Sequence, residues 1–294
     1  GAGAGGVGWA SLVGGGRRGG GAWVAARARG GARGGAQGRG AAVRDAGPAS
    51  AATALTAFGI ACVGSACGSP AFAALGMGMT AATAPRAAVA GRLLLSGLAT
   101  RSAAGPFHLR PAPVPPRCTP SAVMLTLSVG LVPALIVLGR LAAGPLARLL
   151  PDLHSLLLLM AVLSSTAGAL LSLPQRRLRR LLGYAVLAHV GFVLAGIATH
   201  AGEDPFSGTV WLQLAALVPA VAGCLAMSGL AGDALGSTAS GLARSRPGQG
   251  VLLCLFLVAL AGLPPSLAFA GRSALWSALS GSGPMSVILM VDGF

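Results

Sequence analysis

The sequence contains no lysine and only six acidic residues. Its 21 basic residues are therefore all arginine, and its formal net charge is +15. Only 9% of the residues are charged, whereas 54% are hydrophobic and the mean hydropathy is +0.77. Water-soluble globular proteins carry far more charge than this, so the composition argues against that class and favours a protein that lies in lipid.

The sequence also lacks the spacings of a metal site, a disulfide framework or a catalytic centre. Of its five cysteines, only Cys62 and Cys67 lie near each other. We find no glycine-rich phosphate loop and no nucleophile triad. We therefore predict no catalytic residue, no metal and no bound cofactor in this chain, and we interpret the cysteines as small apolar residues.

The sequence contains several long uncharged runs. A helix of ~20 apolar residues crosses a ~30 Å hydrocarbon layer, because a helix satisfies its own backbone hydrogen bonds there. These runs predict an all-α fold, a polytopic bundle of transmembrane helices. The runs are residues 119–139, 155–173, 181–199, 209–231, 251–271 and 273–290.

Composition divides the chain into three parts. Residues 1–50 are rich in arginine and glycine, which predicts a solvated extension or a targeting segment. The alternative is that this segment is a nucleic-acid-binding tail. The segment has no tyrosine or phenylalanine to stack on bases, so we expect no nucleic acid partner. Residues 51–85 are weakly apolar and could form one or two helices or a linker. Residues 86–294 are the predicted transmembrane domain.

Arginine placement predicts the topology. Basic residues gather in alternate connections, at Arg110 and Arg117, at residues 176–180, and at Arg244 and Arg246. The intervening connections are less basic or acidic. By the positive-inside rule, the arginine-rich connections face one side of the membrane, the cytoplasm or its mitochondrial equivalent.

Two arginines stand beside predicted helix breaks. Arg101 precedes Pro106, and Arg272 follows the Pro264-Pro265 pair. Proline interrupts a helix and frees backbone carbonyls, and broken helices with adjacent charges line ion pathways in transporters. Alternatively, each arginine extends from a helix end to the membrane interface. Arg101 and Arg272 are therefore candidates for a proton path.

His189 is the third candidate. It lies about nine residues into its predicted span, ~13 Å along the helix axis and so near the middle of the membrane. A neutral imidazole at that depth can both accept and donate a proton. The alternative is a histidine that only bonds a neighbouring helix. We expect His154 and His200, at span ends, to be interfacial.

Three motifs carry a family resemblance. Residues 179–184 and 188–192 read RRLLGY and AHVGF, residues 260–265 read LAGLPP with Arg272 following, and residues 106–110 read PFHLR. Taken in chain order, from PFHLR through RRLLGY and AHVGF to LAGLPP, they resemble the signatures of subunit 2 of proton-pumping NADH:quinone oxidoreductase, respiratory complex I. The resemblance covers roughly residues 86–290.

The resemblance implies an antiporter-like membrane-arm subunit that contributes to proton translocation coupled to quinone reduction. It implies partners among the other membrane-arm subunits, with lipid, including cardiolipin, around them. Flavin, iron–sulfur clusters and quinone would reside in partner subunits, so this chain would be a non-redox subunit of the enzyme. The implied location is the mitochondrial inner membrane, with a bacterial inner membrane as the alternative.

The chain departs from the family pattern where protons are carried. Arg101 and Arg272 stand where the family has lysine, and Gly130 stands where it has another. A buried lysine can lose its proton, whereas guanidinium stays charged, so the arginines supply fixed charge and no relay. Before residue 86 the one acidic residue is Asp45, which lies in the extension, so the family's glutamate helix has no acidic candidate. Terminal helices of the family also have no counterpart, so we expect a truncated member. A scaffold subunit and a stand-alone cation/proton antiporter or transporter are the competing interpretations.

Overall fold

The computed structural model describes residues 50–65, 84–105, 131–144, 146–147, 150, 152–199, 208–231, 244, 246–279 and 288. Within these residues the regular elements are α-helices, as the sequence predicted. They are the Ser50–Ser65 helix, α3 (Ala84–Arg101), α5 (Val132–Ala143), α7 (Leu153–Ser172), α8 (Leu178–Thr199), α9 (Gly208–Ala231), α11 (Pro247–Ala261) and α12 (Leu267–Leu279).

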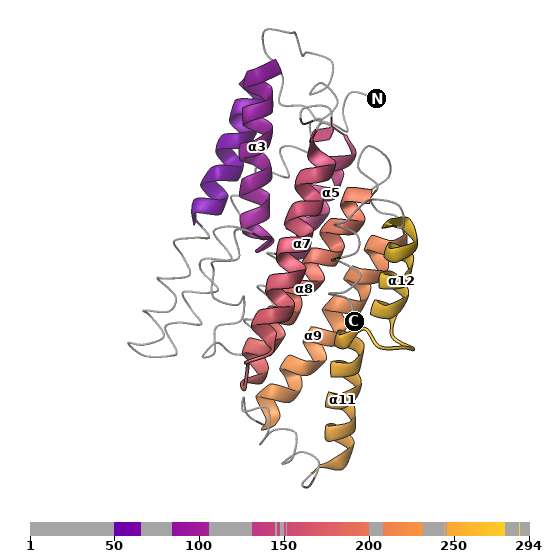
Figure 1. Ribbon diagram of the computed structural model, residues 1–294. Coiled ribbons are helices and arrows are strands. Elements are labelled where there is room, and N and C mark those ends of the chain that lie inside the picture. Colours follow the sequence, from indigo (N-terminus) through magenta and orange to yellow (C-terminus); the bar gives the residue numbers. More distant parts are fainter. Residues whose placement is uncertain are drawn as a thin grey trace, which may run out of the picture.

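The helices run along the length of an elongated bundle (Figure 1). In that view the Ser50–Ser65 helix and α3 lie at one edge, α12 lies at the other, and α7 and α8 lie between them. Most of α8 is buried, including His189 and Phe192. By contrast α11 leaves Val251, Leu252 and Leu255 exposed, as expected for a helix whose outer face contacts lipid.

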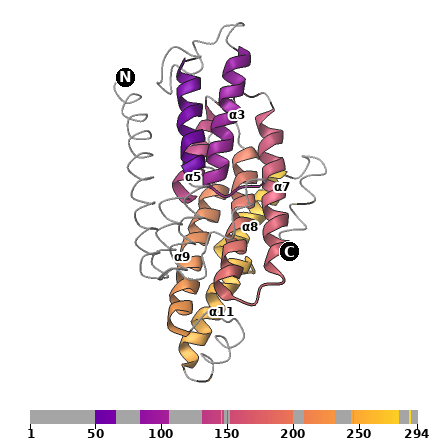
Figure 2. The ribbon, with the colours of Figure 1, turned by 90° about the vertical axis from the view of Figure 1, so that its left-hand side faces the viewer.

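The Ser50–Ser65 helix and α3 form an antiparallel pair and lie side by side in both ribbon views (Figures 1 and 2). A Cβ added at Gly59 would lie 2.7 Å from the Leu94 amide nitrogen, and one at Gly97 would lie 2.6 Å from the Thr56 amide nitrogen. The two backbones can approach this closely because each helix has a glycine at the contact. Part of the weakly apolar segment, residues 51–65, is therefore helical.

Two glycines on the inner faces of α7 and α8 bring these helices together. An added Cβ at Gly168 would lie 2.5 Å from the Ala188 amide nitrogen, and one at Gly191 would lie 2.7 Å from the Ala161 carbonyl oxygen. The tight turn at residues 173–177 makes the pair antiparallel. This α7–α8 seam fixes the position of His189, which lies between Ala188 and Gly191 in the chain.

Three helices are long and apolar enough to cross a membrane: α7, α8 and the part of α9 from Gly208 to Met227. They contain Met160, His189 and Ala216, so three predicted spans are confirmed. The predicted span at 251–271 is two shorter helices, α11 and α12, with a break between them. The predicted span at 119–139 is described only from Leu131 onward, so Gly130 lies outside the described residues.

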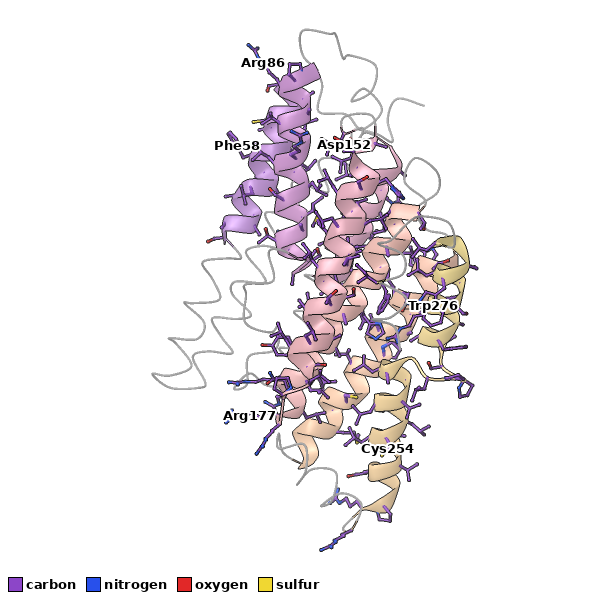
Figure 3. All side chains as sticks on the ribbon, in the orientation of Figure 1. Phe58, Arg86, Asp152, Arg177, Cys254 and Trp276 are labelled. Carbon is purple, nitrogen blue, oxygen red and sulfur yellow. The ribbon has the colours of Figure 1, made fainter. Side chains whose placement is uncertain are left out.

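The topology prediction can be followed along the chain. After the arginine-rich turn at residues 176–180, α8 and α9 cross the bundle once each before Arg244 and Arg246. Figure 3 shows Arg177 at one end of the bundle and Asp152 at the other. The arginine-rich turn and Arg244 therefore share an end, as predicted. Arg110 and the extension before residue 50 lie outside the described residues.

Candidate functional site

The break between α11 and α12 follows directly from the local sequence. Gly262 adopts a left-handed conformation with φ 71°, and the Leu263 and Gly262 amides close the helix on the Val258 and Ala259 carbonyls. This is the Schellman helix ending, in which glycine avoids the penalty of a Cβ. Pro264 and Pro265 follow. The Ser266 hydroxyl then accepts a hydrogen bond of 3.3 Å from the Phe269 amide and so caps the N-terminus of α12.

Two carbonyls at this helix end take no part in the closing hydrogen bonds. Each of them is hydrogen-bonded to a side chain from another helix. The Leu260 carbonyl oxygen lies 2.8 Å from Nε2 of His189, which reaches across from α8. The Ala261 carbonyl oxygen accepts a hydrogen bond of 2.8 Å from a terminal guanidinium nitrogen of Arg272 on α12. His189 from α8 and Arg272 from α12 therefore both bond the end of the broken helix, at adjacent carbonyls.

Phe192 connects the two side chains. The Arg272 guanidinium carbon lies 4.8 Å from the centre of the Phe192 ring, a cation–π contact. His189 meets the same ring edge-on, with ring centres 6.5 Å apart and an angle of 73°. Arg272 and His189 are both buried, so the cluster faces protein and not lipid.

Gln213 is a buried residue of this region that the sequence interpretation missed. It lies on α9, its side chain is 0% exposed, and its carboxamide lies beside the His189 ring. The available signal was one carboxamide side chain, the only asparagine or glutamine in the uncharged run 209–231. Glutamine carries no charge, so a search for ionisable groups passes over it.

Arg101 does not join this cluster. It ends α3 at the opposite edge of the bundle from α12 (Figure 1) and donates a hydrogen bond of 3.2 Å to the Thr53 hydroxyl. The end of α3 repeats the geometry at Gly262, because Ala103 is left-handed with φ 57° and the Ala104 amide bonds the Ala99 carbonyl at 2.9 Å. The three candidates therefore occupy two places, and Pro106 lies outside the described residues.

The hydrogen bonds assign chemical roles to the cluster. A carbonyl oxygen only accepts, so Nε2 of His189 carries hydrogen and, in the neutral ring, Nδ1 holds the free lone pair. Arg272 remains charged and supplies a fixed positive charge. Among the described residues, no group of three or more histidine, cysteine or acidic side chains could hold a metal ion.

A model of one protein family matches residues 48–293, which is most of the chain. Its description is the transmembrane region of the NADH:quinone oxidoreductase/Mrp antiporter family. The chain belongs to this family. The match begins before residue 86, so membership extends over the segment 51–85 as well as the transmembrane domain predicted from the motifs.

Curated relatives of this antiporter family agree. The chain is 33% identical over 250 residues to NADH-quinone oxidoreductase subunit N of Syntrophotalea carbinolica, covering 83% of this chain and 53% of the relative. It is 31% identical over 202 residues to subunit N of Rubrobacter xylanophilus, covering 68% of this chain and 41% of that relative. The chain thus spans about two fifths to one half of the length of these relatives.

Solved structures share the fold. A chain of respiratory complex I from Thermus thermophilus with bound aureothin superposes with a TM-score of 0.72 at 26% identity, covering 87% of this chain and 56% of that chain. A chain of the Mrp complex from Dietzia sp. DQ12-45-1b gives a TM-score of 0.75 at 19% identity, covering 87% and 48%. The second match, at this identity, shows the antiporter-like fold alone.

The comparisons also bear on location. The family and the apolar helices make this a membrane protein of the complex I type. The curated relatives named above come from bacteria. They therefore support a bacterial membrane and give no support to the mitochondrial inner membrane that we expected first.

Proposed function

We propose that this chain is an antiporter-like membrane-arm subunit of an NADH:quinone oxidoreductase and that it moves protons when quinone is reduced elsewhere in the complex. One observation carries the proposal. A histidine that can take up a proton is buried at a helix break, and its Nε2 is committed to the Leu260 carbonyl while its Nδ1 remains available.

Placing polar groups at membrane depth costs free energy. A buried imidazole and a buried guanidinium at membrane depth are expensive and persist where they serve an ion pathway. Here the broken α11–α12 helix supplies acceptors for both side chains. Arg272 cannot release a proton, so His189 is the group in this cluster that relays one.

The test is proton translocation by the purified complex in vesicles, with the chain carrying His189→Ala. We expect quinone reduction to continue while the number of protons moved per NADH falls, because the relay is lost and the redox centres are untouched. His154→Ala is the matched control, since His154 is exposed at the start of α7 and should leave the yield unchanged. An unchanged yield in His189→Ala would make the chain a scaffold.

The remaining features of the proposal follow from membership of such a complex. We infer that flavin, iron–sulfur clusters and quinone belong to partner subunits and that this chain has no redox centre of its own. Its partners would be other membrane-arm subunits and lipid. The exposed Arg176, Arg177 and Arg180 at one end suit anionic headgroups such as cardiolipin. The membrane would be the bacterial inner membrane.

A stand-alone cation/proton antiporter is the second candidate, favoured by the fold shared with the Mrp complex. The two candidates differ in what they require. An antiporter acting alone should move protons in vesicles that contain this chain only and a sodium gradient. A membrane-arm subunit should move none under those conditions, and purification of the native chain should recover flavin and iron–sulfur subunits with it.

A further inference from the structure

Gln213 is a buried polar side chain whose hydrogen-bonding groups are not used within the described part of the chain. Its side chain is fully buried on α9, and neither its carboxamide oxygen nor its nitrogen has a hydrogen-bond partner among those residues. Leaving such a group unsatisfied in a buried site destabilises the fold, so a glutamine at this position requires a reason. Leucine or methionine would fit an apolar helix without that cost.

The neighbours of Gln213 indicate the reason. Nδ1 of His189 is also buried and also lacks a hydrogen-bond partner in the described residues, and the Gln213 carboxamide lies beside this ring. Gln213 also packs against Gly271, where an added Cβ would lie 3.1 Å from its Cγ and 3.2 Å from its carboxamide carbon. The glutamine thus contacts the residue that precedes Arg272 and lies beside the imidazole.

We propose that Gln213 is a positioning residue for the proton-accepting nitrogen of His189, pairing with Nδ1 directly or through one water molecule. When the ring is neutral, Nδ1 accepts a hydrogen bond and the carboxamide nitrogen donates it. When a proton arrives, the new Nδ1–H donates and the carboxamide oxygen accepts it. Gln213 therefore rotates with each transfer and stabilises both forms of the ring.

The choice of an amide over an acid follows from this double role. A carboxylate only accepts, so it would hold the proton on His189 and would also attract the nearby Arg272. A carboxamide has both a donor and an acceptor and no charge. It can therefore donate a hydrogen bond to Nδ1 before protonation and accept one from Nδ1–H afterwards.

The inference rests on the proposed function, but its test can be separated from proton pumping. The full chain is labelled with ¹⁵N-histidine and reconstituted in lipid vesicles, and the His189 resonances are assigned by their loss in His189→Ala. We expect the wild-type ring to carry hydrogen on Nε2 and to show a hydrogen-bonded Nδ1. Gln213→Leu should move the Nδ1 resonance to the position of an unbonded nitrogen.

Two further variants keep the test decisive. Gln175→Leu is the matched control, because Gln175 bonds the Leu171 carbonyl in the turn after α7 and should leave His189 unchanged. Gln213→Glu has the same shape as the native side chain and should shift His189 toward the imidazolium form, even if Gln213→Leu does not fold. His189 resonances identical to wild type in a folded Gln213→Leu or Gln213→Glu variant would overturn the proposal.

Activity then separates the two hypotheses. In the complex, Gln213→Leu should slow proton translocation about tenfold, the effect expected for one lost hydrogen bond in the transfer step. If His189→Ala stops translocation while the Gln213 variants leave the resonances unchanged, the Gln213 inference alone fails. If the resonances shift but His189→Ala translocates normally, the pairing stands and the proposed function fails.

Discussion

At the scale of single residues, Gly262 is the position on which the cluster most depends. Its φ of 71° suits glycine, and an added Cβ would lie 2.7 Å from the Arg272 guanidinium carbon. We expect Gly262→Ala to lower the free energy of unfolding by at least ~1–2 kcal/mol, because a left-handed alanine is strained and Arg272 must move. The measurement is the thermal unfolding midpoint of the chain in detergent.

Gly248→Ala provides the comparison for that experiment. Gly248 lies in the first turn of the same helix, and among the described residues nothing lies within 4 Å of an added Cβ. Alanine is the better helix former, so this variant should be neutral or slightly more stable. Equal midpoints for Gly262→Ala and the wild type would show that neither the φ angle nor the Arg272 contact matters.

Some residues of the cluster could be predicted from the sequence, and others could not. His189 and Arg272 were recognisable because charge and imidazole are rare in apolar runs and proline marks the break beside Arg272. Their shared contact with Phe192, and the place of Gln213, depend on which faces of α8, α9 and α12 meet. A helix that is apolar all round has no periodic pattern, so its sequence does not indicate which face packs against which neighbouring helix.

At the scale of elements, the α7–α8 seam should tolerate no added bulk. Cβ atoms at Gly168 and Gly191 would meet backbone atoms of the facing helix at 2.5 Å and 2.7 Å, and backbone cannot move aside cheaply. We expect Gly168→Ala and Gly191→Ala each to cost ~1–3 kcal/mol of stability. The double variant should cost less than the sum, because the helices separate only once.

The thermal unfolding midpoint again measures this effect, and Gly144→Ala is the control. Gly144 directly follows α5, and the nearest atom to an added Cβ there would lie 3.7 Å away, an ordinary contact. If Gly168→Ala unfolds at the same temperature as Gly144→Ala, the close approach of α7 and α8 is wrong. Because Gly191 is two residues from His189, its variant should also reduce proton translocation.

Of the two helix breaks predicted from proline, the one between α11 and α12 lies where the sequence placed it and the one after α3 does not. The proline pair at 264–265 indicated the end of α11, and the structure supplies the mechanism through Gly262 and Ser266. The end of α3 was predicted at Pro106, yet α3 ends at Arg101 because Ala103 turns left-handed. An alanine in that conformation is uncommon and gives no warning in the sequence.

At the scale of the whole molecule, the two ends of the bundle should face opposite sides of the membrane. Cysteine is introduced by Arg177→Cys, Arg246→Cys or Asp152→Cys into a chain without its five native cysteines, and intact vesicles are treated with a membrane-impermeant maleimide. We expect the first two variants to label from one side and the third from the other. Labelling of Arg177→Cys and Arg246→Cys from opposite sides would contradict the topology.

The occupied carbonyls at the end of α11 have a consequence for ion selectivity. Channels and transporters that pass sodium or potassium replace the hydration shell with oxygen ligands, often backbone carbonyls freed by a broken helix. Here those oxygens, at Leu260 and Ala261, already face an imidazole N–H and a guanidinium. An alkali cation reaching the break would meet positive charge in place of ligands, so these two carbonyls as built do not form a site for a metal cation.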